Sequence, residues 1–398
     1  MRTQVGIIGA GPAGLLLSRL LALQGIDSVV LENRSRAYVE ARIRAGILEQ
    51  HTVDTLTEAG VGDRLRREGL EHHGIYLQYP GTRHKLDFPA LCGRTVWVYG
   101  QTEVTKDLIS TQLAGGPPLL FEVSDVTPED VDTDHPRIRF TDADGNGQVL
   151  DCDVIAGTDG FHGPSRAVVQ QGTTGRTWER TYPYAWLGVL ADAAPSTDEL
   201  IYAWHPDGFA LYSMRSPKVS RLYLQVDPAE KIENWSDDRI WDNLATRFAL
   251  DGWELSTGTI TEKSVLPMRS FVSAPMRHGR LFLAGDAAHI VPPTGAKGLN
   301  LAASDVGFLA RALIEALTER SSAGIDHYSA ICLRRIWKAE RFSWWFTSLT
   351  HRFPDTGAIG RKLQRAELEY LVGSHAASTA LAENYVGLPF EIEPASHS

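Results

Sequence analysis

Residues Val5-Gly-Ile-Ile-Gly9-Ala-Gly11-Pro-Ala-Gly14 form the stretch of this chain that decides its fold. The apolar run at residues 5–8 predicts a short buried strand, and the Leu-rich run at residues 15–23 predicts a helix that Gly25 ends. The glycines between them allow a tight turn, close approach of the backbone to a pyrophosphate, and close packing of helix on strand. We therefore expect a dinucleotide-binding unit in which Gly9, Gly11, Ala13 and Gly14 contact the cofactor.

Glu32 follows a second predicted buried strand at residues 28–31, about 20 residues past the glycine turn. An acid at this place holds the hydroxyls of an unmodified adenosine ribose. FAD and NAD both carry such a ribose, so this unit alone leaves the two cofactors open. The nearest rival fingerprint, Gly145-Asn-Gly147, has no third glycine and lies among turn residues, which predicts a hairpin turn. A protein that holds both FAD and NAD in dinucleotide-binding folds would contain a second glycine fingerprint, and Gly145-Asn-Gly147 does not provide it.

A second segment, Arg280 to Asn300, has the features of the other half of a nucleotide site. Its apolar strand runs into Gly285-Asp286, then a loop bent by glycine and proline, then the start of a helix. This shape suits a ligand with hydroxyls for Asp286 and negative charge for the helix N-terminus. Asp159 also stands where a predicted strand gives way to a glycine-rich turn. We expect these distant segments to hold one cofactor.

Composition sets the broad class. The 398 residues are 43% hydrophobic and 22% charged, which is ordinary for a globular enzyme with more than one domain. The formal net charge of -10 argues against nucleic acid or an anionic membrane surface as a partner. The three cysteines are widely spaced and odd in number, so we expect neither a disulfide framework nor a metal site. Without a signal-peptide core or an apolar run near ~20 residues, we expect a cytoplasmic protein with no membrane span.

The expected fold class is α/β. Two further parts follow the nucleotide-binding unit along the chain. Between residues 181 and 269, aromatic residues crowd into short alternating segments, which predicts a mostly antiparallel sheet. After Asn300 the pattern is helical, with helices predicted at residues 302–317, 328–349 and 360–371. The apolar helical part carries Trp337, Trp344 and Trp345, which favours a homodimer.

The order and spacing of Gly9 to Gly14 with Glu32, of Asp159-Gly160 and of Gly285-Asp286 resemble the three motifs of the single-component FAD-dependent aromatic hydroxylases. Five further stretches resemble the sequences of those members of the family that act on 4-hydroxybenzoate. These stretches are Arg42-Ile-Arg-Ala-Gly46, Tyr99-Gly-Gln101, Pro292-Pro-Thr-Gly-Ala-Lys-Gly-Leu-Asn300, Cys332-Leu-Arg-Arg-Ile-Trp337 and Glu383-Asn-Tyr385-Val-Gly-Leu-Pro389. The resemblance implies a discontinuous, glutathione-reductase-like FAD-binding domain (residues 1–72, 97–180 and 268–348). It also implies an inserted substrate-binding sheet domain (residues 73–96 and 181–267) and a helical C-terminal region (residues 349–398).

The implied enzyme takes a hydride from NADPH or NADH, reacts with O2 as a flavin hydroperoxide, and hydroxylates 4-hydroxybenzoate beside its phenolic oxygen. The product would be 3,4-dihydroxybenzoate, with water and NAD(P)+. Two alternatives stay open, namely the same chemistry on another hydroxybenzoate and a flavin-binding redox protein without hydroxylase activity. Coenzyme preference is open too, because Asn33 and Glu40 lower the attraction that the neighbouring arginines offer a 2′-phosphate.

The resemblance also assigns side chains to the substrate. Tyr202 would meet the phenolic oxygen, Tyr385 would stand behind it, and His72 would end a proton relay toward solvent, which suits the ordinary pKa of histidine. Arg215 would pair with the substrate carboxylate through two parallel hydrogen bonds. The remaining expected substrate contacts are Ser213, Met214, Tyr223 and Pro293, the last at the wall between the ring and the flavin.

The same resemblance assigns further cofactor contacts. Asp286 would hold the ribityl chain, and backbone N–H groups of Leu299 and Asn300 would face the pyrimidine edge of the flavin. Lys297 would add positive charge where the reduced flavin turns anionic. Gln101, Arg42 and Arg44 are further expected FAD contacts. NAD(P)H, which has no fold of its own here, is expected along a surface groove formed by Arg34, Tyr38, Arg42, His162 and Arg269.

Overall fold

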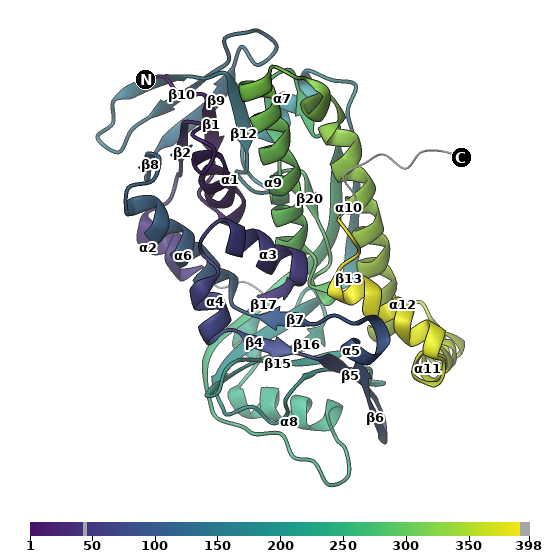
Figure 1. Ribbon diagram of the computed structural model, residues 1–398. Coiled ribbons are helices and arrows are strands. Elements are labelled where there is room, and N and C mark those ends of the chain that lie inside the picture. The colour runs from purple at the N-terminus through teal and green to yellow at the C-terminus, as the bar shows by residue number, and fades with distance from the viewer. Residues whose placement is uncertain (43–45, 391–398) are drawn as a thin grey trace, which may run out of the picture.

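The computed structural model describes residues 1–42 and 46–390. Figure 1 shows an upper part built on a six-stranded sheet and a lower part built on an eight-stranded sheet. The order of the first sheet is β18 (Arg277–His278), β19 (Leu281–Leu283), β12 (Val154–Gly157), β1 (Val5–Ile8), β2 (Ser28–Leu31) and β8 (Leu119–Leu120). Neighbouring strands are parallel from β19 to β8, whereas β18 is antiparallel to β19. This is the open parallel sheet expected of a dinucleotide-binding fold.

The predicted strand–turn–helix–strand unit is present. β1 and β2 have the predicted bounds, are fully buried, and pair in parallel register. α1 (Pro12–Ala22) starts directly after the glycine turn with a proline in its first turn, where a missing N–H costs no helical hydrogen bond. Gly25 has a φ of 70°, a left-handed conformation that ends this segment before β2.

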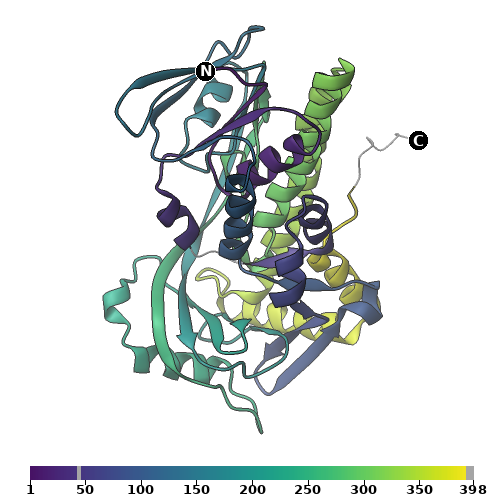
Figure 2. The same cartoon turned by 60° about the vertical axis from the view of Figure 1, so that its left-hand side comes forward.

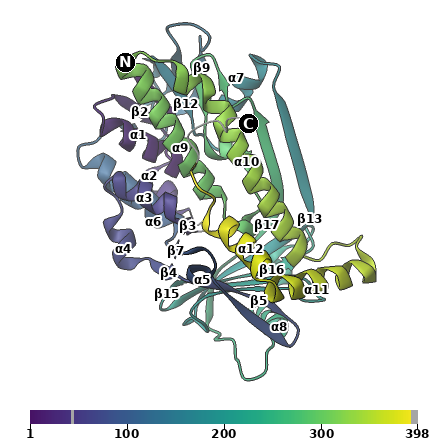
Figure 3. The ribbon, with the colours of Figure 1, turned by 45° about the vertical axis from the view of Figure 1, so that its right-hand side comes forward.

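Helices flank the six-stranded sheet. α9 (Gly298–Ile314) packs against α1 and, as Figures 1 and 3 show in green, runs beside α10 (Ala323–Thr350). The other helices of this part are α2 (Arg36–Ala41), α3 (Gln50–Glu58), α4 (Asp63–Glu68), α6 (Gln101–Leu113), α7 (Ser165–Gln171) and the π-helical turn η4 (Glu315–Glu319). A three-stranded antiparallel sheet of β9 (Ser124–Glu129), β10 (Arg137–Thr141) and β11 (Gly147–Asp151) adjoins it. The turn between β10 and β11 is the predicted hairpin.

The eight-stranded sheet has the order β20 (His289–Ile290), β17 (Thr259–Ala274), β13 (Arg176–Asp192), β16 (Val219–Val226), β15 (Ala210–Ser216), β14 (Leu200–Ala203), β5 (Gly74–Tyr79) and β6 (Thr82–Asp87). It is antiparallel except where β14 meets β5, so the mostly antiparallel sheet predicted for this part is confirmed. Figures 2 and 3 show the long strands β13 and β17 running from the upper part into the lower one. The expected domain boundaries after residues 180 and 267 therefore fall inside these two strands.

The two faces of this sheet bury different clusters. Alternate residues of β14, β15 and β16 pack toward α10 and the C-terminal helices, and Tyr202, Leu211 and Tyr223 belong to that cluster. The intervening residues, among them Met214 and Leu222, pack with α8 (Asp237–Arg247) on the opposite face. Because side chains alternate along a strand, a substrate that lies over Tyr202 lies on the opposite side of the sheet from α8.

The C-terminal region is helical, as predicted, and it closes over the first face of the sheet. α10 and α11 (Gly357–Gly373) contain the predicted helical segments, and α12 (His375–Val386), which the sequence pattern did not predict, brings Tyr385 to the sheet. The remaining elements are α5 (Phe88–Cys92), the short turns η1 (Ile232–Asn234), η2 (Gly285–Ala287) and η3 (Pro293–Gly295), and a sheet of β3 (Ile47–Glu49), β7 (Val96–Val98) and β4 (Leu70–His72). No helix in residues 1–42 and 46–390 is long and apolar enough to cross a membrane.

Candidate active site

The three fingerprint glycines differ in their surroundings. A Cβ at Gly9 would lie 2.5 Å from the carbonyl oxygen of Thr158, and one at Gly14 would collide with the carbonyl oxygen of Gly9. These two glycines are therefore required by close backbone packing. A Cβ at Gly11, in contrast, would meet no atom of the described residues within 4 Å. Gly11 thus faces open space, at the place where a pyrophosphate would approach the start of α1.

The two predicted halves of the nucleotide site lie together. A Cβ added to Gly285 would be 3.6 Å from the Cβ of Ala13 and 3.3 Å from that of Ala302. Ala13 and Leu299 also line one small cavity of about 240 Å³. Asp286, next to Gly285 in η2, is exposed. The Gly285 turn and the glycine fingerprint therefore form one continuous surface.

Glu32 and Asp159 are held by backbone N–H groups. The Glu32 carboxylate accepts hydrogen bonds from Ala10 N and Arg34 N, each at 2.8 Å. Asp159 accepts from Ser165 N at 2.9 Å, whereas its other oxygen, Oδ1, is buried with no partner among the residues that the structure describes. Burial raises the pKa of Asp159. Both carboxylates are fixed in place and retain lone pairs for a further donor.

Gln101 and Arg42 lie close together. Thr102, the neighbour of Gln101 at the start of α6, donates from Oγ1 to the carbonyl oxygen of Arg42 at 3.0 Å. Arg44, the third residue expected beside them, lies outside the described residues.

The residues predicted for the phenolic oxygen meet on one face of the eight-stranded sheet. Tyr202, Leu211 and Tyr223 are in register across β14, β15 and β16. The hydroxyls of Tyr202 and Tyr385 lie 2.8 Å apart, although 183 residues separate them in the chain. Burial raises the pKa of both tyrosines above the ordinary value, so both stay protonated near neutral pH. The pair can therefore donate a hydrogen bond and pass a proton.

β15 places the predicted carboxylate partner on the same face. Ser213 and Arg215 alternate with Met214, whose side chain packs in the cluster on the α8 face. A substrate on the Tyr202 face could therefore reach Met214 only through its backbone atoms. Ser213 Oγ donates to the carbonyl oxygen of Arg221 at 3.0 Å. Arg215 Nε is buried without a partner in the described part of the chain, and burial lowers the pKa of its guanidinium.

Tyr223 completes this face, and a glycine makes room for it. Arg221 Nε donates to the Tyr223 hydroxyl at 3.2 Å. Gly188 lies opposite Tyr223 on β13, and a Cβ there would come within 3.0 Å of the Tyr223 ring. The ring therefore occupies space that a larger residue on β13 would take.

The loop between β20 and α9 joins the two candidate sites. Pro293 is exposed at the start of η3, and Ala296 has a φ of 53°, which is unusual for a residue other than glycine. Lys297 is buried, with its Nζ 2.5 Å from Glu49 Oε1 and 2.9 Å from the carbonyl oxygen of Tyr385. Its charge is therefore paired with Glu49, which the sequence pattern did not single out. Burial lowers the pKa of Lys297, and Glu49 opposes that shift.

Asn300 uses its side chain within the protein. Its amide donates to the carbonyl oxygens of Ile47 and Ala296, and its Oδ1 accepts from Glu49 N and Thr52 Oγ1. The Asn300 side chain therefore fastens the first turn of α9 to β3 and α3. The backbone N–H groups of Leu299 and Asn300 remain the groups that this helix start can offer a ligand.

His72 is buried rather than at the surface. Its Nδ1 lies 2.7 Å from Glu199 Oε2, and Glu199 Oε1 lies 3.1 Å from the ammonium group of Lys85. The His72 and Glu199 side chains are 2% and 4% exposed, whereas that of Lys85 is 35% exposed. Any route from His72 to solvent in this direction therefore passes Glu199 and Lys85, two residues absent from the sequence-based set.

The residues predicted for NAD(P)H fall into two groups. The guanidinium of Arg34 lies over the Tyr38 ring at 5.2 Å, and Arg36 pairs with Glu40 at 2.7 Å. His162 and Arg269 both pack against Phe161, at 5.1 Å and 4.7 Å from its ring. The Arg36–Glu40 pair removes one positive charge from the set available to a 2′-phosphate.

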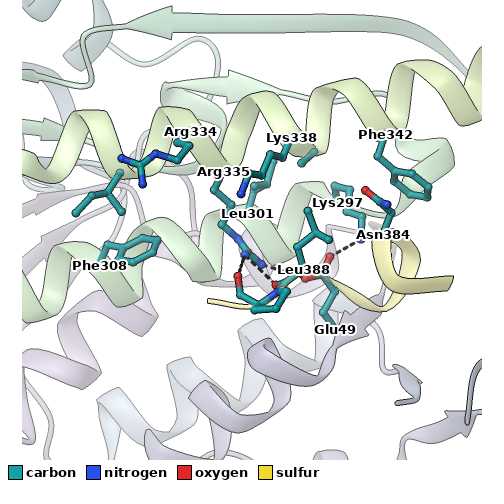
Figure 4. A pocket seen from close by; sticks show the side chains of 13 residues that line it. Glu49, Lys297, Leu301, Phe308, Arg334, Arg335, Lys338, Phe342, Asn384 and Leu388 are labelled. Carbon is teal, nitrogen blue, oxygen red and sulfur yellow. Dashed lines mark hydrogen bonds and ion pairs between the residues drawn. The ribbon is translucent and has the colours of Figure 1, made fainter. Parts of the chain in front are cut away.

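A separate cavity of about 610 Å³ lies between α9, α10 and the segment after α12 (Figure 4). Lys297, Glu49 and Arg335 meet in it, and Arg335 also donates to the carbonyl oxygens of Leu388 and Pro389. Tyr202, Arg215 and Tyr223 are not among the described residues that line it. Among the described residues, Lys297 is the one residue of the predicted site that lines this cavity.

Comparison with known proteins identifies the family of the chain. A family model described as an FAD binding domain matches residues 2–343. The p-hydroxybenzoate hydroxylase of Acinetobacter baylyi is 53% identical over 395 residues, covering 99% of this chain and 97% of that protein. The chain belongs to this family of FAD-binding hydroxylases.

Two more distant matches are one in sequence and one in fold. The probable NADH-specific resorcinol 4-hydroxylase of Rhodococcus jostii is 26% identical over 339 residues, covering 82% of this chain and 61% of that protein. The crystal structure of p-nitrophenol 4-monooxygenase PnpA from Pseudomonas putida DLL-E4 superposes with a TM-score of 0.80 at 20% identity, covering 98% of this chain and 99% of the other. The predicted fold class is confirmed.

The residues present fit the FAD of the hydroxylase family. Gly11 leaves room for a pyrophosphate, Glu32 is fixed at the end of β2, and the Gly285 turn adjoins Ala13. Within the described ranges, the Oδ1 of Asp159 is one more polar atom without a partner, and the Asp159 backbone lies beside Gly9.

Proposed function

We propose that the protein is an FAD-dependent monooxygenase that converts 4-hydroxybenzoate, NAD(P)H, a proton and O2 to 3,4-dihydroxybenzoate, NAD(P)+ and water. The observation that carries this proposal is the position of Arg215, whose buried Nε has no partner among the described residues, on the same sheet face as the hydrogen-bonded Tyr202–Tyr385 pair. A cation at one end of a buried face and hydroxyl donors at another match a ring that bears a carboxylate and a phenolic oxygen. FAD, when bound, accepts the hydride and delivers one oxygen atom of O2.

Arg215 would hold the substrate carboxylate. A carboxylate taken into this buried face without a cation would be strongly destabilised, and a guanidinium offers it two parallel donors. Ser213 and Tyr223 would add hydroxyl groups, and Gly188 keeps the space that the Tyr223 ring needs. The arginine fixes the ring axis, so the phenolic oxygen is directed toward Tyr202.

Tyr202 would favour the phenolate form of the substrate. A free phenol has a pKa near ~10, so bringing it to neutrality requires about 4 kcal/mol of preferential stabilisation of the anion. Tyr202 would first pass the phenolic proton on to Tyr385; its hydroxyl, protonated again, would then donate to the phenolate. We propose that His72, with Glu199 and Lys85 behind it, passes the proton to solvent. An electron-rich phenolate ring then accepts oxygen more readily at the adjacent carbon.

The loop after β20 would place ring and flavin together. Pro293 would form the wall between them, and Asp286 would hold the ribityl chain. The backbone N–H groups of Leu299 and Asn300 would face the flavin at the positive end of α9. Gly9, Gly11, Ala13, Gly14 and Glu32 would hold the pyrophosphate and ribose, with Arg42, Arg44, Gln101, Asp159 and Lys297 as further contacts.

Several finer features are part of the same proposal. NAD(P)H would bind transiently along Arg34, Tyr38 and Arg42 and beside His162 and Arg269. The division into an FAD domain, a substrate domain and a C-terminal region serves to place the substrate sheet under the flavin. A cytoplasmic location fits the three free cysteines, Cys92, Cys152 and Cys332.

A homodimer would cover the exposed apolar side chains of α11. Ile359 is 73% exposed, Leu363 is 64% exposed and Tyr370 is 59% exposed, all on that helix. Apolar side chains gathered in this way mark protein–protein contacts. Sedimentation of the wild type and of an Ile359→Asp, Leu363→Asp variant would test this, with a dimer expected for the first and a monomer for the second.

Turnover measurements test the proposed activity. Consumption of O2 and of NADPH or NADH is followed with 4-hydroxybenzoate, 3-hydroxybenzoate, 3,4-dihydroxybenzoate or no acid, and products are separated by chromatography. We expect 4-hydroxybenzoate to accelerate NAD(P)H oxidation and to yield 3,4-dihydroxybenzoate in near-stoichiometric amount. A hydroxylated product from another acid, with none from 4-hydroxybenzoate, would show that the protein acts on that acid. A yellow protein that hydroxylates none of them would be a flavin-binding redox protein instead.

A further inference from the structure

His351, the residue directly after α10, is completely buried and has a fixed tautomer. Its Nε2 lies 2.7 Å from the indole Nε1 of Trp186 on β13. An indole nitrogen only donates, so Nε2 accepts and the ring proton is on Nδ1. Nδ1 lies 3.1 Å from the carbonyl oxygen of Thr347 and 3.0 Å from Thr350 Oγ1, whose own proton goes to the carbonyl oxygen of Phe346, so both oxygens can accept from Nδ1. Burial lowers the pKa of His351 to about 3, so the ring stays neutral at physiological pH.

Aromatic rings enclose the His351 imidazole. Phe209 stacks on it at 4.1 Å and Tyr184 stacks on it at 4.7 Å. The Trp186 ring is nearly coplanar with the imidazole, at an interplanar angle of 7°, as an in-plane hydrogen bond requires. His351 therefore has little freedom to move, and it holds the orientation of the Trp186 indole.

Trp186 in turn lies against the proposed substrate residues. Its ring packs on Tyr223 at 4.8 Å and on Phe209 at 5.4 Å, and Phe209 packs on Tyr202 at 6.1 Å. The indole is thus hydrogen-bonded to His351 and in direct contact with Tyr223, whose ring belongs to the substrate face. A rotation of Trp186 would displace Tyr223 or leave a gap beside it.

The same end of α10 is tied to the loop of the candidate site. Thr347 Oγ1 donates to Thr294 Oγ1 at 2.8 Å, next to Pro293 in η3. Beyond His351, Arg352 N donates to the Gln225 side chain on β16 at 2.9 Å. The last turn of α10 therefore links the loop, through Thr347, to the substrate sheet, through His351 and Arg352.

We infer that His351 is a positioning residue for the hydroxylation, which acts by holding the Trp186 indole as a wall of the substrate site beside Tyr223. This inference rests on the proposed function, because that function makes the Tyr202–Tyr223 face the place of the substrate. Without an acceptor at residue 351, the Trp186 N–H is left unpaired in the core, and the indole turns to find a partner. The ring of the substrate is then held less tightly, and water reaches the oxidant more often.

Two substitutions at residue 351 separate hydrogen bonding from packing. His351→Phe keeps an aromatic ring between Phe209 and Tyr184 but removes the acceptor, whereas His351→Gln supplies an acceptor without the ring. We expect His351→Phe to raise the Kd for 4-hydroxybenzoate by about tenfold, as expected for orphaning a buried donor, and to divert a larger share of NAD(P)H oxidation to H2O2. His351→Gln should recover part of both losses. His327→Phe, on the exposed first turns of the same helix, is the control and should match the wild type.

A double-mutant cycle with Trp186→Phe gives the decisive result. Trp186→Phe removes the indole donor, so adding His351→Phe to it should change the Kd and the H2O2 yield less than twofold further. Effects that multiply in the double variant would overturn the inference, as would a His351→Phe enzyme with unchanged Kd and coupling. A wild type that forms no dihydroxy product from 4-hydroxybenzoate would refute the proposed function instead. The cycle would then measure the Kd of whichever aromatic acid perturbs the flavin spectrum. If the Kd changes of His351→Phe and Trp186→Phe multiply in the double variant, the role of His351 would still be rejected.

Discussion

Arg215→Ala gives two opposite expected effects, on substrate binding and on stability. Arg215 is half-buried, its Nε is buried with no partner in the described ranges, and burial lowers the pKa of its guanidinium although Tyr223 opposes that shift. The free protein therefore carries the cost of a poorly paired buried cation, which the substrate carboxylate offsets on binding. Removing the side chain leaves that carboxylate without a cation, at a cost of about 3 to 5 kcal/mol. This corresponds to a Kd for 4-hydroxybenzoate raised by roughly 10² to 10³·⁵-fold.

The assay titrates the flavin absorbance of the purified holoenzyme with 4-hydroxybenzoate and, in parallel, with the neutral 4-hydroxybenzamide. We expect the large loss of affinity with the acid and a much smaller one with the amide, since the amide carries no charge for Arg215 to pair. The thermal midpoint of the substrate-free variant should equal or exceed that of the wild type. Arg239→Ala removes an exposed arginine of α8 on the opposite face of the sheet and serves as control. An Arg215→Ala enzyme that binds the acid within threefold of the wild type would refute the reasoning.

Three further predictions concern cofactor, proton transfer and pH. Gly11→Ala should lose FAD on gel filtration whereas Gly147→Ala should keep it, although both glycines face open space among the described residues, and equal retention would show that no ligand approaches Gly11. Glu199→Gln should lower kcat by about tenfold, with little change in KM, because it removes the carboxylate that orients His72. The exposed neighbour variant Asp198→Asn should leave kcat unchanged, and a Glu199→Gln enzyme with wild-type kcat would exclude this proton route. Burial raises the pKa of Glu340 to about 7, so the folded state holds a proton that the unfolded state loses near 4.5, and stability should fall by up to about 3 kcal/mol between pH 4.5 and 7. Glu340→Gln should flatten that part of the unfolding free energy measured against pH, and an unchanged slope would place the proton elsewhere.

Local patterns predicted much of the fold correctly. The buried strands at residues 5–8 and 28–31 have their predicted bounds, because short apolar runs between glycine turns have few other ways to be buried. The hairpin at Gly145-Asn-Gly147 was predicted from its turn residues, and three C-terminal helices were predicted from their helical pattern. α12 was missed because its apolar residues do not form a regular helical stripe, and packing on the sheet, rather than periodicity, holds it.

The candidate site was predictable only in part. Resemblance to a known family named Tyr202, Tyr385 and Arg215, which the fold then brings onto one sheet face. Glu199, Glu49 and Trp186 were missed, since each is an ordinary residue in its own segment and gains its meaning from a partner far away in the chain. Strand alternation could have flagged Met214, because it lies between Ser213 and Arg215 and must point to the other face.

The sequence by itself determined the βαβ unit, because a strand, a glycine turn and a helix depend on neighbours within a few residues. The choice of FAD and the residues for an aromatic acid came from the resemblance of longer stretches to a known family. Only the tertiary structure decided which charges are paired and which polar groups are left over. Lys297 is compensated by Glu49, His72 is backed by Glu199, and Arg215 keeps an unpartnered Nε within the described residues. The physical reason is that the strength of a charge or donor depends on burial and on partners within about 4 Å, which the folded chain supplies from segments hundreds of residues apart.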